Sequence, residues 1–237
     1  MRLDKLLSNM GYGSRKETKI LLKSKSVEVN GVVAKDVSMH VHPEKDEILV
    51  LGEKVVYTEF IYLMMNKPPG VISATEDKKD QTVIDLLEPS DQHFQPFPVG
   101  RLDKDTEGLL VITNDGHLTH QLLSPKKHVP KVYYAVIEGR VTEDDIEKFK
   151  EGVMLDDGYF TKPGFLTIIR SGETSEIELM ITEGKFHQVK RMFQAVGKTV
   201  TYLKRMKMGA LSLDPTLKLG EYRPLSEDEL ILLQQKE

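Results

Sequence analysis

Apolar residues recur along this chain at two different spacings, which predict short helices at the start and mostly strands afterwards. Leu3, Leu6 and Leu7 have the three- to four-residue spacing of a helix face. Ser14 and Glu17 form the sequence pattern of a capping box, so a second helix is expected to begin there. The first part of the chain is therefore predicted to be a small helical module.

Beyond this module the apolar residues come in short runs bounded by turn residues, a pattern typical of strands. Asn30-Gly31 lies between two such runs and is the strongest short hairpin signal. Strands are expected at 27–33 (as a hairpin), 48–51, 61–65, 109–112, 131–137, 165–169, 176–181, 199–207 and 211–213, and helices at 14–23, 82–87, 117–123, 142–150, 186–196 and from 226 onward. Many strands with short connections favour an α+β fold, with a large mixed, mostly antiparallel sheet flanked by helices.

A change in composition near residues 52–60 predicts a boundary between two domains. The sequence GEKVVYTEF there separates the helical module from the apolar run that opens the larger sheet. A chain of 237 residues suits one large domain or two smaller ones. We expect one domain at 1–58 and a second at 59–237.

Composition places the chain among ordinary globular proteins. Hydrophobic residues make up 39% and charged residues 30%, which argues against wholesale disorder. The chain has no cysteine, which excludes disulfides and thiolate zinc sites. The N-terminus carries no apolar signal core, and no apolar run approaches the roughly 18 residues of a membrane span. These features predict a soluble cytoplasmic protein without a membrane partner.

Charge is segregated along the chain, which the net charge of −4 conceals. Residues 1–35 hold eight Lys and Arg against three acidic residues, and residues 183–208 hold seven against one. Residues 141–158 instead hold seven acidic residues against two lysines. Two basic segments far apart in the sequence indicate a surface for a polyanion. Separately solvated helix faces are the alternative.

The densest group of reactive side chains lies between Gly100 and Gly108, directly before the apolar run 109–112. It comprises Arg101, Asp103, Lys104, Asp105, Thr106 and Glu107. A polar loop on a buried strand commonly presents reactive side chains, and carboxylates beside fixed cations are expected to have shifted pKa values. An ordinary hairpin turn with surface charges is the alternative.

Three segments are candidates to meet in one cleft: 100–108, 131–133 and 184–193. Together they supply carboxylates, an aromatic side chain and cations. An aspartate held by a lysine stays ionised and can act as a nucleophile or a base. A tyrosine can stack on an unpaired base, and an arginine can fill the gap left by an extruded nucleotide. This combination suits chemistry on RNA.

Several familiar chemistries find no support in the sequence. It contains neither G-x-x-x-x-G-K-[ST] nor G-x-G-x-x-G, so nothing indicates a nucleotide-cofactor loop, and it lacks G-x-S-x-G. His117 and His120 lie three apart, but no carboxylate lies close enough in sequence to complete a convincing metal site. Surface or packing roles are expected for both.

The sequences RLDKLL at 2–7, SRK at 14–16 and VEVNG at 27–31 resemble the S4 RNA-binding domain. On the second helix, Arg15, Lys19 and Lys23 fall four apart and share one stripe, suited to phosphates, while Ile20, Leu21 and Leu22 are expected on the buried side. The residues expected to contact RNA are Arg2, Lys5, Arg15, Lys16, Lys19 and Lys23, with Lys185 and Arg191 outside this domain.

Four longer motifs follow: NKPPGVISAT, GRLDKDTEGLLVITNDG, PKVYY and EGKFHQVKRMFQAVG, with GEYRPLSEDEL near the end. With them the chain resembles, over essentially its whole length, the pseudouridine synthases of the ribosomal small-subunit type. The resemblance implies an enzyme that converts a uridine in RNA to pseudouridine. The base is detached, rotated and rejoined through carbon, with no metal or organic cofactor.

The same resemblance implies roles for individual residues. Asp103 matches the catalytic carboxylate, and Arg101 the residue that helps displace the target nucleotide. Tyr133 matches the aromatic ring that packs on the base, and Lys190 the cation that pairs with Asp103. Tyr134 is expected to face the other way, as a core aromatic of the strand.

Leu102 and Val189 complete the expected substrate-binding set, with Val189 at the apolar position that lines the pocket. From the residues alone, Asp105 and Glu107 remain rivals for the catalytic role, although Asp105 suits a turn cap and Glu107 a solvated position. Whether Asp103 attacks the sugar, attacks the base or removes a proton stays open.

The expected substrate is a specific uridine of 16S ribosomal RNA, free or in an assembling small subunit, bound by a monomer. One alternative is the same reaction on 23S ribosomal RNA, and another is a non-catalytic ribosome-assembly RNA-binding protein. The catalytic class is favoured, because a binding-only protein does not need Asp103, Tyr133 and Lys190 together.

Overall fold

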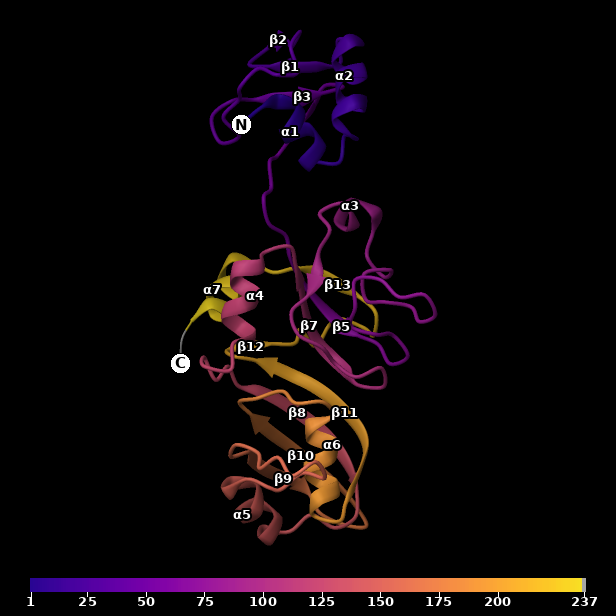
Figure 1. The fold of residues 1–237 in the computed structure, drawn as a ribbon, viewed down its shortest axis with the longest axis vertical. Coiled ribbons are helices and arrows are strands. Elements are labelled where there is room, and N and C mark those ends of the chain that lie inside the picture. Colours follow the sequence, from indigo (N-terminus) through magenta and orange to yellow (C-terminus); the bar gives the residue numbers. More distant parts are fainter. Residues whose placement is uncertain (236–237) are drawn as a thin grey trace. The chain divides into compact units, whose positions relative to one another are not determined.

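The computed structural model describes residues 1–235 and divides the chain into two compact units (Figure 1). The first unit is Met1–Ile61 together with Glu88–Gln95, and the second is Tyr62–Leu87 together with the residues from Pro96 onward. The last two residues of the second expected domain lie outside the described range. Among the described residues, no helix has the length and apolar character needed to cross a membrane.

The first unit contains the two expected N-terminal helices, the hairpin, and one short helix that was not expected. Its helices are α1 (Leu3–Asn9), α2 (Arg15–Lys23) and α3 (Pro89–Gln92), and its sheet has the order β2 (Val32–Val33), β1 (Val27–Val29), β3 (Ile48–Val50), β4 (Glu53–Lys54). The capping box forms, with the Ser14 backbone N–H donating to Glu17 Oε2 at 2.7 Å. Local capping thus begins α2 where the sequence predicts it.

The core of the first unit follows the predicted spacing, with one correction. Leu3, Leu6 and Leu7 are fully buried, as the helical spacing requires. On α2, Leu22 is buried but Ile20 is 63% exposed, so the expectation that Ile20 faces the core is wrong. Residues two positions apart on a helix point to nearly opposite sides. The side with Leu22 and Thr18 is buried, and Leu21 beside it packs partly buried against the same core.

The second unit is built on one sheet, as the sequence predicts. Its order is β13 (Tyr222–Pro224), β5 (Tyr62–Lys67), β7 (Glu107–Thr113), β11 (Thr199–Met208), β8 (Lys131–Glu138), β10 (Thr174–Ile181), β9 (Phe165–Arg170), with β12 (Leu211–Ser212) on β11 and β6 (Phe97–Pro98) on β7. Among these described strands, only the β7–β11 pair is parallel. The α+β fold class with a mostly antiparallel mixed sheet is confirmed.

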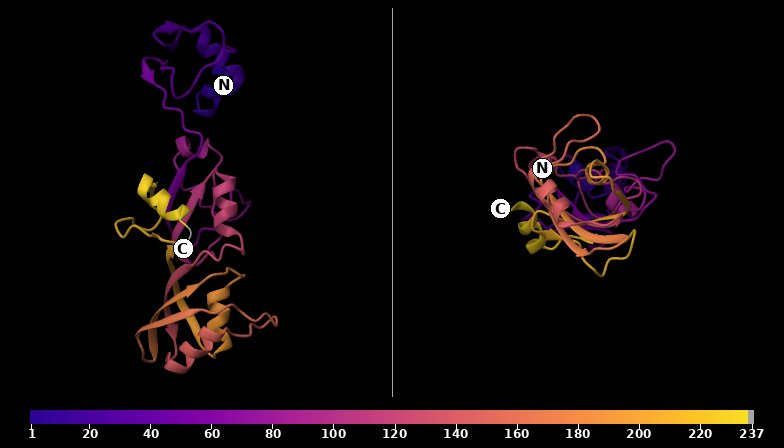
Figure 2. Two further views of the ribbon diagram at one scale, coloured as in Figure 1. Left: turned by 90° about the vertical axis from the view of Figure 1, so that its left-hand side faces the viewer. Right: turned by 90° about the horizontal axis from the view of Figure 1, so that it is seen from below.

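Four helices pack beside this sheet: α4 (Gly116–Leu123), α5 (Glu143–Glu151), α6 (Gln188–Ala195) and α7 (Glu227–Gln234). The views in Figure 2 show the sheet as a twisted layer with the helices next to it. Leu118 and Leu122 of α4 join the core formed with β7, and α6 lies against β11. Phe149 of α5 and Phe193 of α6 pack with ring centroids 4.9 Å apart.

Two local predictions fail. The segment 82–87 is not helical, because the Thr82 and Asp85 side chains close a single turn and Pro89 begins α3 soon afterwards. The helix expected from 186 begins at Gln188 instead, because His187 adopts a left-handed backbone with φ of 48°. A left-handed residue cannot continue a right-handed helix toward the N-terminus.

The parallel pair β7–β11 requires a glycine where the polar loop enters the sheet. Gly108 has φ of 104°, and a Cβ there would lie 2.3 Å from the carbonyl oxygen of Arg205. Any side chain at Gly108 would push the two strands apart. This close approach fixes the loop that precedes β7 against β11.

Candidate active site

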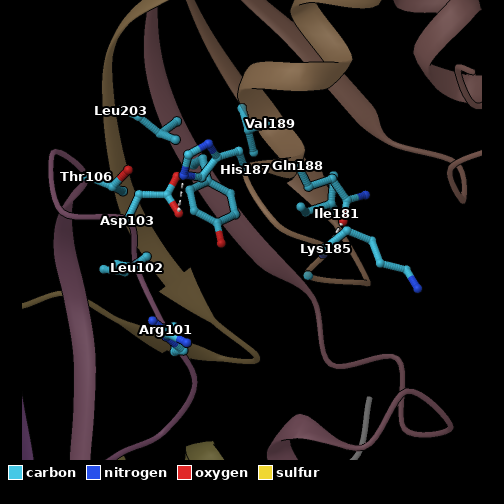
Figure 3. A pocket seen from close by; sticks show the side chains of 12 residues that line it. Arg101, Leu102, Asp103, Thr106, Ile181, Lys185, His187, Gln188, Val189 and Leu203 are labelled. Atoms are coloured by element: carbon cyan, nitrogen blue, oxygen red, sulfur yellow. Dashed lines mark hydrogen bonds and ion pairs between the residues drawn. The ribbon is translucent and has the colours of Figure 1, made fainter. Parts of the chain in front are cut away.

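A pocket of about 70 Å³ lies where the polar loop, β8 and the start of α6 meet (Figure 3). Its lining residues are Arg101, Leu102, Asp103, Thr106, Tyr133, Ile181, Gly184, Lys185, His187, Gln188, Val189 and Leu203. The three segments that the sequence offered as candidates for one cleft therefore do meet. The structure also adds walls from β10 and β11.

The carboxylate of Asp103 lies between a cation and an imidazole. Its Oδ2 is 3.5 Å from Nζ of Lys190, and its Oδ1 is 3.6 Å from Nε2 of His187. Figure 3 shows the Asp103 and His187 side chains directed toward each other. The pairing of Asp103 with Lys190 is thus present in the geometry, and the contact from His187 is an addition that the sequence did not indicate.

Lys190 is shared between two carboxylates. Its ammonium lies 2.6 Å from Oδ1 of Asp105, closer than to Asp103. The hydrogen bond from Lys190 lowers the pKa of Asp105, as expected for a carboxylate beside a fixed cation. However, the Asp105 side chain is 73% exposed and that of Asp103 only 23%, and Asp103 is the one that lines the pocket.

Glu107, the other rival carboxylate, is held by a tyrosine. Its Oε2 accepts a hydrogen bond from the Tyr202 hydroxyl at 2.6 Å. Burial, followed by this hydrogen bond, raises the pKa of Tyr202, so Tyr202 remains the donor. The expectation that Glu107 is solvated is wrong, because it anchors β7 to β11.

A buried lysine holds the backbone of the polar loop. Lys67 is fully buried, and its Nζ donates to the carbonyl oxygens of Pro68 (2.9 Å), Asp103 (3.1 Å) and Thr106 (2.9 Å). Burial lowers the pKa of Lys67 to about 8. Sequence reasoning missed this residue, which appeared only within the motif NKPPGVISAT.

The segment that follows Lys67 fixes the same loop further. The backbone N–H of Leu102 donates to Ser73 Oγ at 3.0 Å, and Ser73 Oγ lies 3.1 Å from the carbonyl oxygen of Leu102. The backbone N–H of Gly70 donates to the carbonyl of Lys104 at 2.7 Å. The loop is therefore anchored by backbone contacts on both sides of Asp103, which leaves that carboxylate preorganised.

The remaining expected substrate residues all line the pocket. Arg101 is exposed and makes no hydrogen bond or ion pair with any residue in the described part of the chain, while Leu102 and Val189 are buried. Tyr133 is also buried. Tyr134 faces the other side of β8 and donates to Glu176, so its expected role as the core aromatic is wrong. The alternation of the strand puts Tyr133 on the inner side instead.

The basic residues expected to contact RNA divide into three groups. Lys5, Arg15, Lys16, Lys19 and Lys23 are exposed and form no ion pair with the residues described. Arg2 instead pairs with buried Asp4 at 2.7 Å, and Arg191 pairs with Asp156 and Asp157. Lys185 places its Nζ 4.4 Å from the ring centre of Tyr159.

Comparison with known proteins identifies the class. Residues 61–195 match the family described as RNA pseudouridylate synthase, and residues 1–48 match the S4 domain. The chain belongs to the RNA pseudouridylate synthase family and carries an S4 domain at its N-terminus. It is an RNA pseudouridine synthase, an isomerase.

Similar proteins span nearly the whole chain. A Bacillus subtilis protein named "Uncharacterized RNA pseudouridine synthase YtzG" is 58% identical over 98% of this chain and 98% of its own length. "Ribosomal small subunit pseudouridine synthase A" of Escherichia coli K12 is 36% identical, over 97% and 98%. A solved structure titled "Crystal structure of pseudouridylate synthase" is 34% identical with a TM-score of 0.69, over 98% and 99%.

Proposed function

We propose that this protein converts one uridine of 16S ribosomal RNA to pseudouridine, with Asp103 as the catalytic carboxylate. The observation that carries the residue assignment is that Asp103 alone among the three loop carboxylates lines the pocket, beside Lys190 and His187. The choice of RNA is supported by similar proteins from Escherichia coli and Vibrio cholerae, 36% and 40% identical, which are named ribosomal small subunit pseudouridine synthase A.

The reaction needs a carboxylate that stays ionised in a partly enclosed site. The bond between C1′ of the ribose and N1 of uracil breaks, and a new bond forms between C1′ and C5. The proton on C5 leaves to solvent and N1 gains one, so the product is an isomer of the substrate. A fixed carboxylate can assist by covalent attack or by stabilising positive charge on the sugar, and Lys190 lies 3.5 Å from the Asp103 carboxylate.

The residues around Asp103 supply binding and access. Tyr133 and Val189 are buried in the pocket wall and are proposed to pack on the uracil ring, with Leu102 next to them. Arg101 is exposed beside the pocket and unpaired with any described residue, which suits a guanidinium that fills the space left by the extruded nucleotide.

We propose that the two domains divide the work. Residues 1–58 bind RNA, and residues 59–237 perform the isomerisation. The exposed stripe of Arg15, Lys19 and Lys23 supports RNA contact by the first domain. We propose that the enzyme acts as a monomer in the cytoplasm, on free RNA or on an assembling subunit.

Mapping of pseudouridines across all ribosomal RNA, in cells with and without this protein, tests the proposal. We expect one uridine of 16S RNA to lose its modification without the protein and to regain it with the purified enzyme. Loss of a pseudouridine from 23S RNA instead would show that 23S RNA is the substrate, and the assignment as a pseudouridine synthase would stand. No lost site, combined with normal RNA binding, would support the ribosome-assembly alternative.

A further inference from the structure

An aromatic ring stands exposed at the edge of the pocket. Phe186 is 75% exposed although it lies between two pocket-lining residues, Lys185 and His187. Its ring stacks on the imidazole of His187, with centroids 3.8 Å apart and planes inclined by 19°. One side of the Phe186 ring packs on His187. The rest of the ring is exposed and offers apolar surface on which a further ring can stack.

The stacked pair is tied directly to the reactive carboxylate. His187 contacts Asp103 through Nε2 at 3.6 Å, and Phe186 packs on the same imidazole. A base that stacked on the exposed side of Phe186 would be the third ring of a stack that begins at His187, a residue of the pocket wall.

The backbone that presents the pair is strained and firmly held. His187 has φ of 48°, a left-handed conformation that is uncommon outside glycine. Buried Gln188 fixes the turn, since its Oε1 accepts from the Lys185 backbone N–H at 2.8 Å and its Nε2 donates to Glu183. The Tyr159 hydroxyl also donates to Glu183, at 2.7 Å. Backbone strain that persists under such restraint is frequent at functional positions.

Two exposed cations line the same pocket. Lys185 directly precedes Phe186 and rests over the Tyr159 ring, and Arg101 comes from the polar loop. An exposed ring flanked by positive charge matches the chemistry of single-stranded nucleic acid, where rings stack on bases and cations contact phosphates. Phe160 and Phe165 are also exposed, but neither forms a ring contact with another described residue.

We propose that Phe186, backed by His187, is a stacking platform for an unpaired base of the substrate RNA that adjoins the target uridine. The platform would position the target and favour substrates with an unstacked neighbouring base. This inference rests on the activity of an RNA pseudouridine synthase, and it holds whether the substrate is 16S or 23S RNA.

The chain has no tryptophan, so F186W introduces a single fluorescent reporter at the platform. Unmodified 16S and 23S transcripts are added separately, and binding is followed in parallel by anisotropy of labelled RNA. We expect the indole to be quenched in proportion to binding by the substrate RNA. The control variant F165W, at a phenylalanine that is 55% exposed, should show no such quenching. Binding without quenching of F186W would overturn the proposal.

A second experiment measures the contribution of the ring to the reaction. F186A should raise KM about tenfold, because stacking on one base contributes roughly that much to binding. The loss should fall mainly on KM rather than on kcat, and F186Y should restore KM. F165A is the control for loss of an exposed phenylalanine. A purely structural role would instead lower the melting temperature and reduce kcat.

The position of the stacked base is found with RNA fragments that lack one base at a time beside the target uridine. In the wild-type enzyme, one such position should weaken binding about tenfold. In F186A the same missing base should have no further effect, because the ring that met it is gone. Additive losses at every position would overturn the proposal. If the enzyme modifies 23S RNA, the same scan is made with fragments of 23S RNA. A wrong choice of substrate RNA is therefore distinguishable from a failure of the stacking proposal.

Discussion

The ammonium group of Lys190 lies 3.5 Å from the carboxylate of Asp103, although strands β7 to β10 separate the two residues along the chain. The same ammonium lies 2.6 Å from Asp105. One cation therefore restrains both aspartates of the loop. Lys190 is on α6, which packs against β11. Gly108 allows β11 to lie close beside β7 at the end of the loop.

Replacing Lys190 by Met should slow the reaction while the fold survives. Loss of the cation frees the Asp103 carboxylate to move, and a displacement of about 1 Å can reduce the rate on the order of 100-fold. Single-turnover release of tritium from uridine labelled at C5 measures the effect, and Lys190→Arg should recover part of the rate. An unchanged rate in Lys190→Met would show that Lys190 has no role in the reaction.

The same variant should change the titration of Asp105. Its pKa is lowered in the folded protein by Lys190, so this carboxylate contributes stability above its unfolded pKa and loses it as pH falls through the folded pKa. In Lys190→Met the pKa of Asp105 should return toward 3.8, which carboxyl NMR can follow. A titration identical to wild type would contradict the pairing.

Lys67 should also make the stability depend on pH, here because burial disfavours its charged form. Burial lowers its pKa from 10.5 to about 8, so the unfolded chain binds the proton more tightly than the folded one. Stability should therefore rise with pH between about 8 and 10.5, by on the order of 3 kcal/mol at about 1.4 kcal/mol per pH unit. The difference in unfolding free energy between wild type and Lys67→Met isolates this contribution. A difference that stays constant across that window would show that Lys67 does not titrate as described.

The fold and part of the site were predictable because their signals are local. Hydrophobic spacing and the Ser14 capping box predict helices, and alternation predicts that Tyr133 and Tyr134 face opposite sides of β8. The motifs also identify Asp103 and Lys190 as partners. Spacing and motifs do not show how deeply each side chain is buried. For this reason Tyr134 was expected in the core and Ile20 on the buried side of α2.

The contacts that hold the loop come from tertiary structure and leave no local signal. The buried ammonium of Lys67 is satisfied because four carbonyl oxygens converge on it, one of them from Asp103 itself. The left-handed backbone of His187 makes α6 begin two residues later than the sequence suggests, and the His187 imidazole lies against Asp103. Neither feature follows from residue type or spacing.

Gly108→Ala should destabilise the protein strongly, because its Cβ would overlap the Arg205 carbonyl and φ is 104°. Gly158→Ala is the matched control, since it also has positive φ but no atom within 4 Å of a Cβ. We expect a loss of about 1 kcal/mol for Gly158→Ala from the backbone alone, and about 3 kcal/mol or more for Gly108→Ala. Chemical denaturation measures both. Equal losses would mean that the contact between β7 and β11 is not tight.

Removing the charges of Arg15, Lys19 and Lys23 together should weaken RNA binding and flatten its dependence on salt. Each phosphate contact contributes roughly 0.7 to 0.9 to the slope of log K against log salt concentration, so the slope should fall by about 2 to 3. Neutralising Lys25, Lys35 and Lys45, exposed lysines of the same unit, is the charge-matched control. Equal changes in the two triple variants would mean that the stripe on α2 has no special role.

The central claim is that Asp103, and not its neighbour Asp105, carries the isomerisation. Both aspartates contact Lys190, so Asp103→Asn and Asp105→Asn are closely matched isosteric changes. The deciding measurement is tritium release from substrate RNA labelled at C5 of uridine, with RNA binding measured in parallel. We predict no detectable release from Asp103→Asn, with RNA affinity retained, and measurable release from Asp105→Asn. Release from Asp103→Asn at the wild-type rate would contradict the account.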